Sequence, residues 1–202
     1  AYLRETGDLA LLEEEITFYR KGIPVAERES ACVLDHLRRS LAYTKTHTGR
    51  HGLPLLGYAD WNDTINLPGN AESLFNANLY GRALIDMIAL LDHLGQKSEA
   101  DAYRRDHEHM KTLVEGCAWD GKWYVRYFEE NGHPLGSHRN EQGKIFTNGQ
   151  SWPILSGFAG PERAQRAMES VRELLNTKHG IKLSYPGYKK FEPKVGGVTT
   201  YP

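Results

Sequence analysis

Residues 58–66 gather side chains that could bind a sugar and transfer a proton. Their sequence, Tyr-Ala-Asp-Trp-Asn-Asp-Thr-Ile-Asn, contains two carboxylates, two amides, an indole and a phenol. Carboxylates and amides hydrogen-bond to hydroxyl groups, and the face of an indole packs on the C–H face of a sugar ring. The candidate carbohydrate-binding residues are therefore Tyr58, Asp60, Trp61, Asn62 and Asp63.

Two other interpretations of this segment stay open at the level of residue types. Closely spaced Asp and Asn residues also occur in calcium loops, but the alternating oxygen ligands and the closing glutamate of an EF-hand are absent. Asp and Asn also form helix caps and turns. The histidines share no metal-ligand spacing with a carboxylate, so we predict no metal site.

The elements that must position these residues are mainly helical by hydrophobic periodicity. The pattern predicts helices over residues 8–18, 27–46, 72–94, 98–114, 150–158 and 161–175, with Asp8 capping the first. The helix over 72–94 is apolar around much of its circumference, so we expect it to be buried on more than one side. The candidate site then lies in a loop between two long helices, where rigid elements hold functional side chains.

One segment departs from the helical pattern. Residues 122–128 alternate and are rich in aromatic residues, and the Asn131-Gly132 pair that follows predicts a β-hairpin. Alternating aromatic residues in a hairpin are more often packing residues than a sugar platform; here they are Trp119, Trp123, Tyr124, Tyr127 and Phe128. The final 26 residues are rich in Gly, Pro, Lys and Tyr and predict a loop, whose lysines we interpret as solvated.

Composition places the chain among globular proteins. Hydrophobic residues make up 40% and charged residues 25%, and the formal net charge is −1 over 202 residues, enough for one substantial core. These values exclude a disordered or collagen-like chain and give no electrostatic reason to expect nucleic acid as a partner. Serial helix pairs suit a bundle, a solenoid or an α/α toroid, among which periodicity does not choose.

Four stretches resemble one known family in the same order along the chain. Residues 52–66, which include Ala-Asp-Trp-Asn-Asp at 59–63, resemble the catalytic motif of glycoside hydrolase family 94, the inverting glycoside phosphorylases. Residues 2–8, 143–152 and 180–202 are similar to further parts of the same family. The resemblance implies a mainly α fold, part of an (α/α)6 barrel with one small β-hairpin. It implies that residues 1–202 are a fragment of a single catalytic domain, truncated at both ends.

The resemblance also implies the site residues and the reaction. Asp63 corresponds to the proton donor and Trp61 to the indole that lines the sugar subsites, with Asp60 and Asn62 supporting the loop or binding hydroxyls. Tyr58 and Gln150 are weaker substrate-binding candidates, at the acceptor side and in the stretch 143–152. The implied reaction is phosphorolysis of a β-glucoside to α-glucose 1-phosphate. One carboxyl is enough because inorganic phosphate, already anionic, replaces the activated water of an inverting hydrolase.

The expected partners are a β-linked glucose disaccharide or oligosaccharide and phosphate as co-substrate, without a cofactor. The family binds phosphate and the non-reducing sugar with residues outside 1–202, so we expect the isolated fragment to be inactive. A homodimer of the full-length enzyme and a cytoplasmic location, which reduced Cys32 and Cys117 fit, complete these expectations.

Two alternatives stay open. An inverting hydrolase would need a second carboxylate ~6.5–9.5 Å from the first. A carbohydrate-binding or chain-length-setting region of a β-glucan synthase, on the cytoplasmic side of a membrane, would bind sugar without phosphate-dependent turnover.

Overall fold

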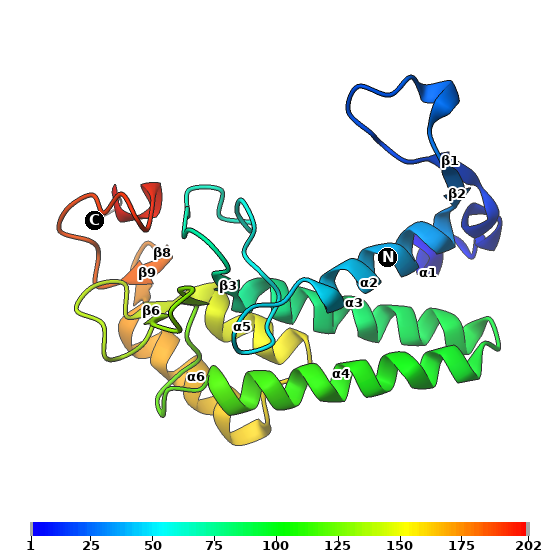
Figure 1. Ribbon diagram of the computed structural model, residues 1–202. Coiled ribbons are helices and arrows are strands. Elements are labelled where there is room, and N and C mark those ends of the chain that lie inside the picture. Colours follow the sequence, from blue (N-terminus) through cyan, green and yellow to red (C-terminus); the bar gives the residue numbers. More distant parts are fainter. Residues whose placement is uncertain (1, 201–202) are drawn as a thin grey trace. The chain divides into compact units, whose positions relative to one another are not determined.

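The computed structural model describes residues 2–200, which are mainly helical with several very short strands (Figure 1). The chain divides into two compact units, residues 1–46 and 47–202. Among residues 2–200, no helix combines the length and the apolar character that crossing a membrane requires.

The first unit is built around one short antiparallel ribbon. Its elements are α1 (Tyr2–Thr6), the 3-10 helix η1 (Leu9–Glu13), β1 (Glu15–Thr17), the 3-10 helix η2 (Val25–Glu27), β2 (Ser30–Cys32) and α2 (Val33–Thr46). Strands β1 and β2 pair with Ile16 opposite Ala31. The end of α2 agrees with the sequence prediction, and within the helix Asp35 and Arg39 form an ion pair across one turn at 2.6 Å.

Two predictions for this unit are wrong. Residues 8–18 do not form one helix: a 3-10 turn is followed by β1, and the side chain of Asp8 makes no cap hydrogen bond. The second helix begins at Val33 rather than near residue 27, because the residues before it pair with β1. Cross-strand hydrogen bonds between distant residues decide both cases, and a local helical pattern does not reveal them.

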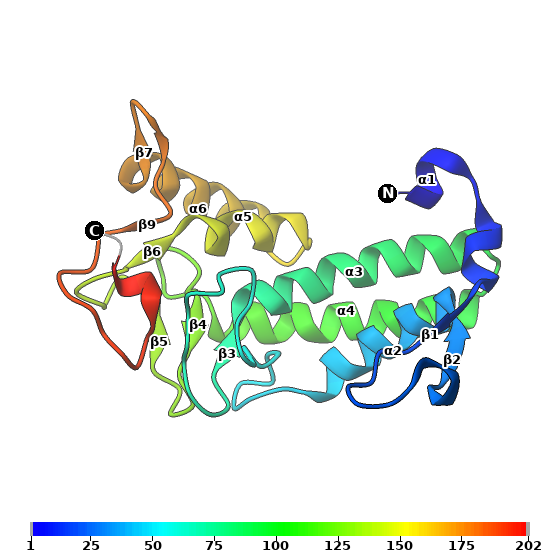
Figure 2. The same ribbon diagram turned by 90° about the horizontal axis from the view of Figure 1, so that it is seen from above.

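The second unit contains the long helices. Its elements are β3 (Glu72–Ser73), α3 (Leu74–His93), α4 (Lys97–Cys117), β4 (Tyr127–Phe128), β5 (Pro134–Leu135), β6 (Ile145–Phe146), α5 (Thr147–Leu155), α6 (Pro161–Leu174), β7 (Asn176–Thr177), β8 (Gly180–Ile181), β9 (Ser184–Tyr185) and η3 (Gly197–Thr200). Figure 2 shows α3 and α4 running side by side, with α5 beside α3. The predicted loop over the final residues therefore contains short strands and one 3-10 helix.

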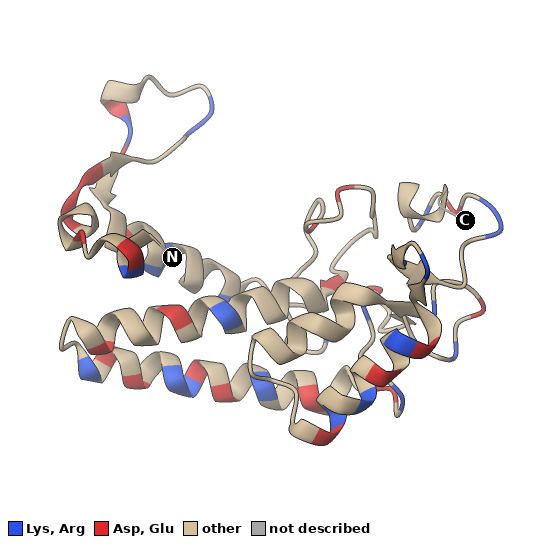
Figure 3. Cartoon of the chain, turned by 180° about the vertical axis from the view of Figure 1, so that it is seen from behind, with Lys and Arg blue, Asp and Glu red and all other residues tan. Residues whose placement is uncertain are grey.

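Helix α3 is the buried centre of this unit, as its sequence predicts. Its buried residues lie around more than one side: Leu74, Phe75, Ala77, Asn78, Tyr80, Gly81, Leu84, Met87 and Leu91. The hydroxyl of Ser73 caps its N-terminus by accepting from Asn76 N at 3.1 Å. Charged residues lie mainly on α4 and α6 rather than on α3, which places the solvated faces on those helices (Figure 3).

The predicted hairpin is present but shorter than its sequence pattern. Strand β4 pairs with β5 across the Asn131-Gly132 turn, and β3 adds a third strand on the other side of β4. The aromatic side chains of this region are packing residues: Trp123, Tyr124, Tyr127 and Phe128 are all buried, and Trp119 is half-buried. Helix α6 begins at Pro161 as predicted, and α5 begins at Thr147, three residues before the predicted residue 150.

Candidate active site

The segment of residues 47–73 is a long loop held at its start by a buried carboxylate. Glu72 Oε1 accepts hydrogen bonds from His51 N at 2.8 Å and from Leu53 N at 3.0 Å, and Glu72 Oε2 lies 2.6 Å from His51 Nδ1. Gly49 packs against Glu72 so closely that a Cβ there would lie 2.4 Å from Glu72 Cγ. The first part of the loop is therefore fixed to β3, directly before α3.

A second buried carboxylate, that of Asp60, holds the middle of the loop. Its side chain is 0% exposed, and its Oδ2 lies 2.7 Å from Arg126 Nη2 as an ion pair, although the pair lacks the alignment of a hydrogen bond. Ser73 Oγ donates to Oδ2 at 2.7 Å, and Tyr127 OH donates to Oδ1 at 3.4 Å. Burial raises the pKa of Tyr127; nearby Arg126 acts to lower it, and Asp60 acts to raise it. The net rise keeps the Tyr127 hydroxyl protonated, so that it serves as a hydrogen-bond donor.

Arg126, the partner of Asp60, is itself enclosed. Its side chain is 1% exposed. Its Nε donates to Asn148 Oδ1 at 3.1 Å and its Nη1 to Ser73 Oγ at 3.3 Å. The guanidinium also lies 4.0 Å from the ring centroid of Tyr127 and 5.4 Å from that of Phe75, within the range of cation–π contacts. One cation thus joins the loop, the start of α3, β4 and the first turn of α5.

Hydrogen-bonded turns set which motif side chains face inward. Asn62 N donates to Asp60 Oδ1 at 3.0 Å, and Asn62 Oδ1 accepts from Thr64 N at 3.2 Å and Thr64 Oγ1 at 2.6 Å. The residue Asn62 is only 8% exposed. Such Asx turns fix the backbone around the residues that they enclose.

The two residues enclosed by these turns, Trp61 and Asp63, face outward, as does Tyr58 before them. Trp61 is 51% exposed and Asp63 is exposed, while Tyr58 is fully exposed. Within residues 2–200 the Asp63 carboxylate makes no hydrogen bond or ion pair, in contrast to Asp60. Of the two aspartates, the geometry leaves Asp63 available to a ligand and Asp60 occupied by the protein.

An aromatic row lies beside Trp61. The Trp61 and Phe75 ring centroids are 6.4 Å apart and the Phe75 and Trp152 centroids 5.0 Å apart, both edge to face. The row joins the loop to α3 and α5. Its outer member, Trp61, therefore presents an indole to a ligand with an aromatic ring packed behind it.

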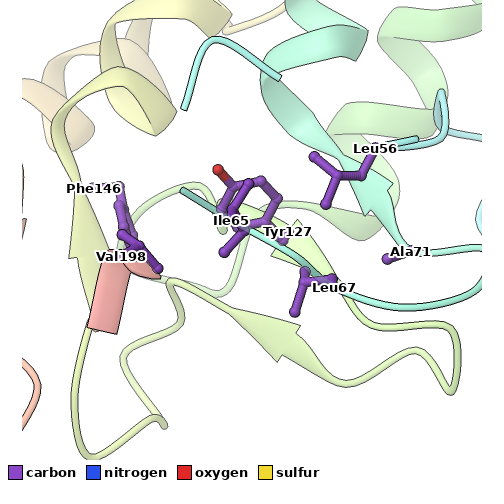
Figure 4. Close-up of a cluster of buried hydrophobic side chains, with 7 residues drawn as sticks. All are labelled: Leu56, Ile65, Leu67, Ala71, Tyr127, Phe146 and Val198. Carbon is purple, nitrogen blue, oxygen red and sulfur yellow. The ribbon is translucent and has the colours of Figure 1, made fainter. Parts of the chain in front are cut away.

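The end of the loop is held by the C-terminal segment. Asn66 N donates to Val195 O at 2.9 Å, and Val198 N donates to Thr64 O at 3.1 Å. Beneath this contact lies a buried apolar cluster from the loop, β4, β6 and η3 (Figure 4). Its members are Leu56, Ile65, Leu67, Ala71, Tyr127, Phe146 and Val198. Anchors at its start, middle and end thus determine the course of the loop.

The family model for the catalytic domain of the glycosyl hydrolase 94 superfamily matches residues 1–202. The chain belongs to this family. It is 34% identical over 202 residues to the 3-O-beta-D-glucopyranosyl-beta-D-glucuronide phosphorylase of Paenibacillus borealis, a match that covers 98% of this chain and 25% of that protein. It is 30% identical over 200 residues to the N,N'-diacetylchitobiose phosphorylase of Vibrio proteolyticus, with 98% of this chain and 24% of that protein covered.

A further relative is named for a different activity. The cyclic beta-(1,2)-glucan synthase NdvB of Rhizobium meliloti is 29% identical over 220 residues, covering 100% of this chain and 8% of that protein. A solved structure, a GH78 family rhamnosidase of Bacillus sp. GL1, is similar in fold with a TM-score of 0.58 at 18% identity, over 75% of this chain and 15% of that one. The present glycosyl hydrolase 94 chain spans about a quarter of the length of the two phosphorylases.

The structure gathers most of the predicted site residues of this glycosyl hydrolase 94 chain into one loop, but it separates them by role. Asp60 and Asn62 face inward and support the loop, whereas Tyr58, Trp61 and Asp63 face outward. Among residues 2–200 no cluster of three or more His, Cys, Asp or Glu side chains is arranged to hold a metal ion.

Gln150 lies apart from this loop. Its side chain is fully buried and bonds only to backbone: Oε1 accepts from Tyr124 N at 3.0 Å, and Nε2 donates to Tyr124 O at 2.9 Å and Phe146 O at 3.2 Å. These bonds hold α5 against the hairpin region. The amide is thus occupied by the protein rather than presented to a substrate.

Sequence reasoning missed Arg126, Ser73 and Asn148, which hold the site together. Arg126 offered one signal, since it is a charged residue inside an aromatic, alternating segment. A charged residue at such a position is seldom buried without a partner, so this position could have signalled a buried acidic partner, although not Asp60 in particular.

Proposed function

We propose that Asp63 is the general acid of an inverting glycoside phosphorylase, of which this chain supplies part of the catalytic domain. The observation that supports this assignment is the different state of the two motif aspartates. Asp60 is enclosed and ion-paired with Arg126, whereas Asp63 is exposed beside the indole of Trp61. A general acid must reach the leaving oxygen of the substrate, and of the two motif aspartates Asp63 is the exposed one.

In the proposed reaction, an oxygen of inorganic phosphate attacks the anomeric carbon from the face opposite the leaving group. The glycosidic C–O bond breaks, its electron pair goes to the leaving oxygen, and the carboxyl of Asp63 donates its proton there. The products are an α-sugar 1-phosphate and a free sugar. Trp61 binds the C–H face of a sugar ring, and Tyr58 lies at the acceptor side.

The same proposal covers the wider protein. Residues 1–202 form one part of a single (α/α)6 barrel, which the neighbouring pairs α3 with α4 and α5 with α6 support. Phosphate-binding groups come from other parts of the full protein, so the isolated chain is inactive. The free thiols of Cys32 and Cys117 support a cytoplasmic location.

The substrate is a β-linked disaccharide or oligosaccharide. One relative is named for a glucopyranosyl glucuronide, which agrees with glucose as the donor sugar. Another relative is named for N,N'-diacetylchitobiose. Assays of the full-length protein with a panel of β-linked disaccharides therefore identify the sugars and the linkage.

The proposal is tested with the full-length protein. We expect release of a sugar 1-phosphate from one or more β-linked disaccharides only when phosphate is present. Asp63→Asn should lower kcat by about 10²–10⁴-fold, the usual contribution of a general acid. Asp101→Asn, an exposed aspartate on α4, is the matched control and should leave the rate unchanged. Full phosphorolysis by Asp63→Asn would refute the role of Asp63.

A second candidate function rests on the similarity to NdvB. In that case this region would bind a β-glucan within a synthase and would not catalyse phosphate-dependent turnover. Sugar binding by the full-length protein without sugar 1-phosphate release would favour it. The hydrolase alternative is less favoured, because Asp60, the nearest second carboxylate in sequence, is already occupied by Arg126 and Ser73.

A further inference from the structure

We propose that Arg126 is a positioning residue for the proton donor, acting through the carboxylate of Asp60 and the ring of Phe75. This inference rests on the proposed function of Asp63. Arg126 does not reach solvent, with 1% of its side chain exposed, so it acts on the substrate only through its neighbours.

The buried pair of Arg126 and Asp60 is not accounted for by stability alone. Burying a charged pair removes both groups from water, and this cost often equals the attraction between them, so apolar residues of similar size are commonly as stable. Here Ser73, Asn148 and two aromatic rings offset part of that cost. What an arginine adds over an apolar residue is a charge held at a fixed point: Nε and Nη1 are fixed by their hydrogen bonds to Asn148 and Ser73, so the planar guanidinium places Nη2 2.7 Å from Asp60 Oδ2.

Arg126 is itself held in place by its backbone and by a close neighbour. Its backbone N donates to Leu135 O at 2.8 Å, and its carbonyl accepts from Leu74 N at 3.2 Å. Gly136 packs against it so closely that a Cβ there would lie 2.7 Å from Arg126 N. The guanidinium therefore extends from a fixed point in the hairpin region towards the loop.

Two consecutive turns connect the position of Asp60 to that of Asp63. Asp60 Oδ1 accepts from Asn62 N, and Asn62 Oδ1 accepts from Thr64 N, so the backbone on both sides of Asp63 follows from where Asp60 is held. The same guanidinium lies 5.4 Å from the ring of Phe75, which packs behind Trp61. Arg126 thus orients both the acid and the indole of the proposed site.

The inference predicts a specific kinetic signature in the full-length protein. A misplaced acid slows substrates whose leaving oxygen needs a proton. It has little effect on the β-glycosyl fluoride of the same donor sugar, because fluoride departs with the electron pair of the C–F bond as phosphate attacks the anomeric carbon. We expect Arg126→Met to lower kcat on the disaccharide by about 10²-fold, with a smaller change in KM, and to keep the rate on the fluoride within about fivefold.

Several variants keep the test decisive. Asp60→Asn removes the charge of the pair while preserving its shape, and it should give the same signature if Arg126→Met does not fold. Arg126→Lys should recover only part of the rate, because an ammonium lacks the planar fork. Arg104→Met removes an exposed arginine of α4 and is the matched control, expected to leave both rates unchanged.

The outcomes separate the inference from the proposed function. If the unaltered full-length protein releases no sugar 1-phosphate, the proposed function fails, and the inference fails with it. If that protein is active but Arg126→Met or Asp60→Asn lowers the disaccharide and fluoride rates in parallel, the role is structural and the positioning inference is overturned. Loss on the disaccharide alone, shared with Asp63→Asn, supports it.

Discussion

At the scale of single residues, buried carboxylates hold the loops of the second unit by accepting backbone N–H groups. Glu72 accepts from two such groups, and Asp120 accepts from Lys122 N and Trp123 N at 3.0 Å and from His138 N at 2.6 Å. Leaving a buried N–H without a partner costs about 1–3 kcal/mol. Each carboxylate therefore holds the backbone of one loop in place.

Asp120 shows the direction of this link. Burial alone would raise the pKa of Asp120, but the N–H groups of His138, Trp123 and Lys122 outweigh it and lower the pKa below its ordinary value of 3.8. A carboxyl whose pKa is lower in the folded state stabilises that state while it is ionised. This contribution is present above about pH 3.8 and is lost as the pH falls through the lower folded-state pKa.

We predict that Asp120→Asn lowers the free energy of unfolding by about 1–3 kcal/mol at pH 7, as expected for hydrogen bonds to a charged acceptor. The difference from the unaltered protein should shrink below about pH 4, because the unaltered carboxyl then becomes neutral. Urea unfolding between pH 7 and pH 2 measures both quantities. Asp101→Asn is the exposed control and should change the free energy by less than about 0.5 kcal/mol at pH 7. A difference that does not vary with pH would contradict the role of the ionised carboxyl.

At the scale of elements, the contact between α3 and the turn after α5 depends on a glycine. Gly81 lies inside α3, and a Cβ there would lie 2.1 Å from Cζ of Phe158, which is fully buried. Gly116 lies inside α4 and is exposed, and a Cβ there would meet nothing within 4 Å. The two helical glycines thus differ in packing rather than in backbone type.

We predict opposite effects of the same substitution at these two glycines. Gly81→Ala should destabilise the protein by about 1–3 kcal/mol through overpacking, whereas Gly116→Ala should stabilise it by about 0.5–1 kcal/mol through helix propensity. Urea unfolding of both variants measures this. Adding Phe158→Leu should reduce the effect of Gly81→Ala, because the smaller side chain makes room. Equal effects at the two sites would contradict the close packing.

The elements that sequence predicts well are those whose signal is local. The apolar pattern over residues 72–94 found α3 within two residues at its start and one at its end, and Pro161 marked the beginning of α6. The pattern over residues 8–18 failed, because the pairing of Ile16 with Ala31 is decided by a strand further along the chain. Helical periodicity is a local pattern and carries no information about a pairing partner elsewhere in the chain.

The candidate site divides in the same way. Residue types were enough to find the motif at 59–63, and the family resemblance is what made Asp63, rather than Asp60, the expected proton donor. The buried partner of Asp60 was not found, because the ion pair with Arg126 forms only when the hairpin region folds onto the loop. Gln150 stood out by resemblance, but its burial against the Tyr124 backbone could not be read from its neighbours in sequence.

At the scale of the whole molecule, two segments far apart in the sequence contact each other next to Asp63, the proposed acid. Residues 64–66 pair with residues 195–198, and Val198 completes the buried cluster beneath them. Gly196 makes this approach possible: its φ is +105°, and a Cβ there would lie 2.6 Å from Thr64 O. Its neighbour Gly197 has ordinary space, with the nearest atom, Thr64 Cβ, at 3.4 Å.

We therefore predict that two adjacent glycines respond differently to one added methyl group. Gly196→Ala combines a left-handed backbone with a backbone clash, so it should lower the free energy of unfolding by about 1–3 kcal/mol and speed hydrogen exchange at the Asn66 amide, which donates to Val195 O. Gly197→Ala should leave both nearly unchanged. Hydrogen exchange resolved by residue measures the local effect, and urea unfolding measures the global one. If both variants protect the Asn66 amide equally, the C-terminal segment does not hold the end of the loop, and the course of the loop past Asp63 must be fixed by the Asp60 and Asn62 turns alone.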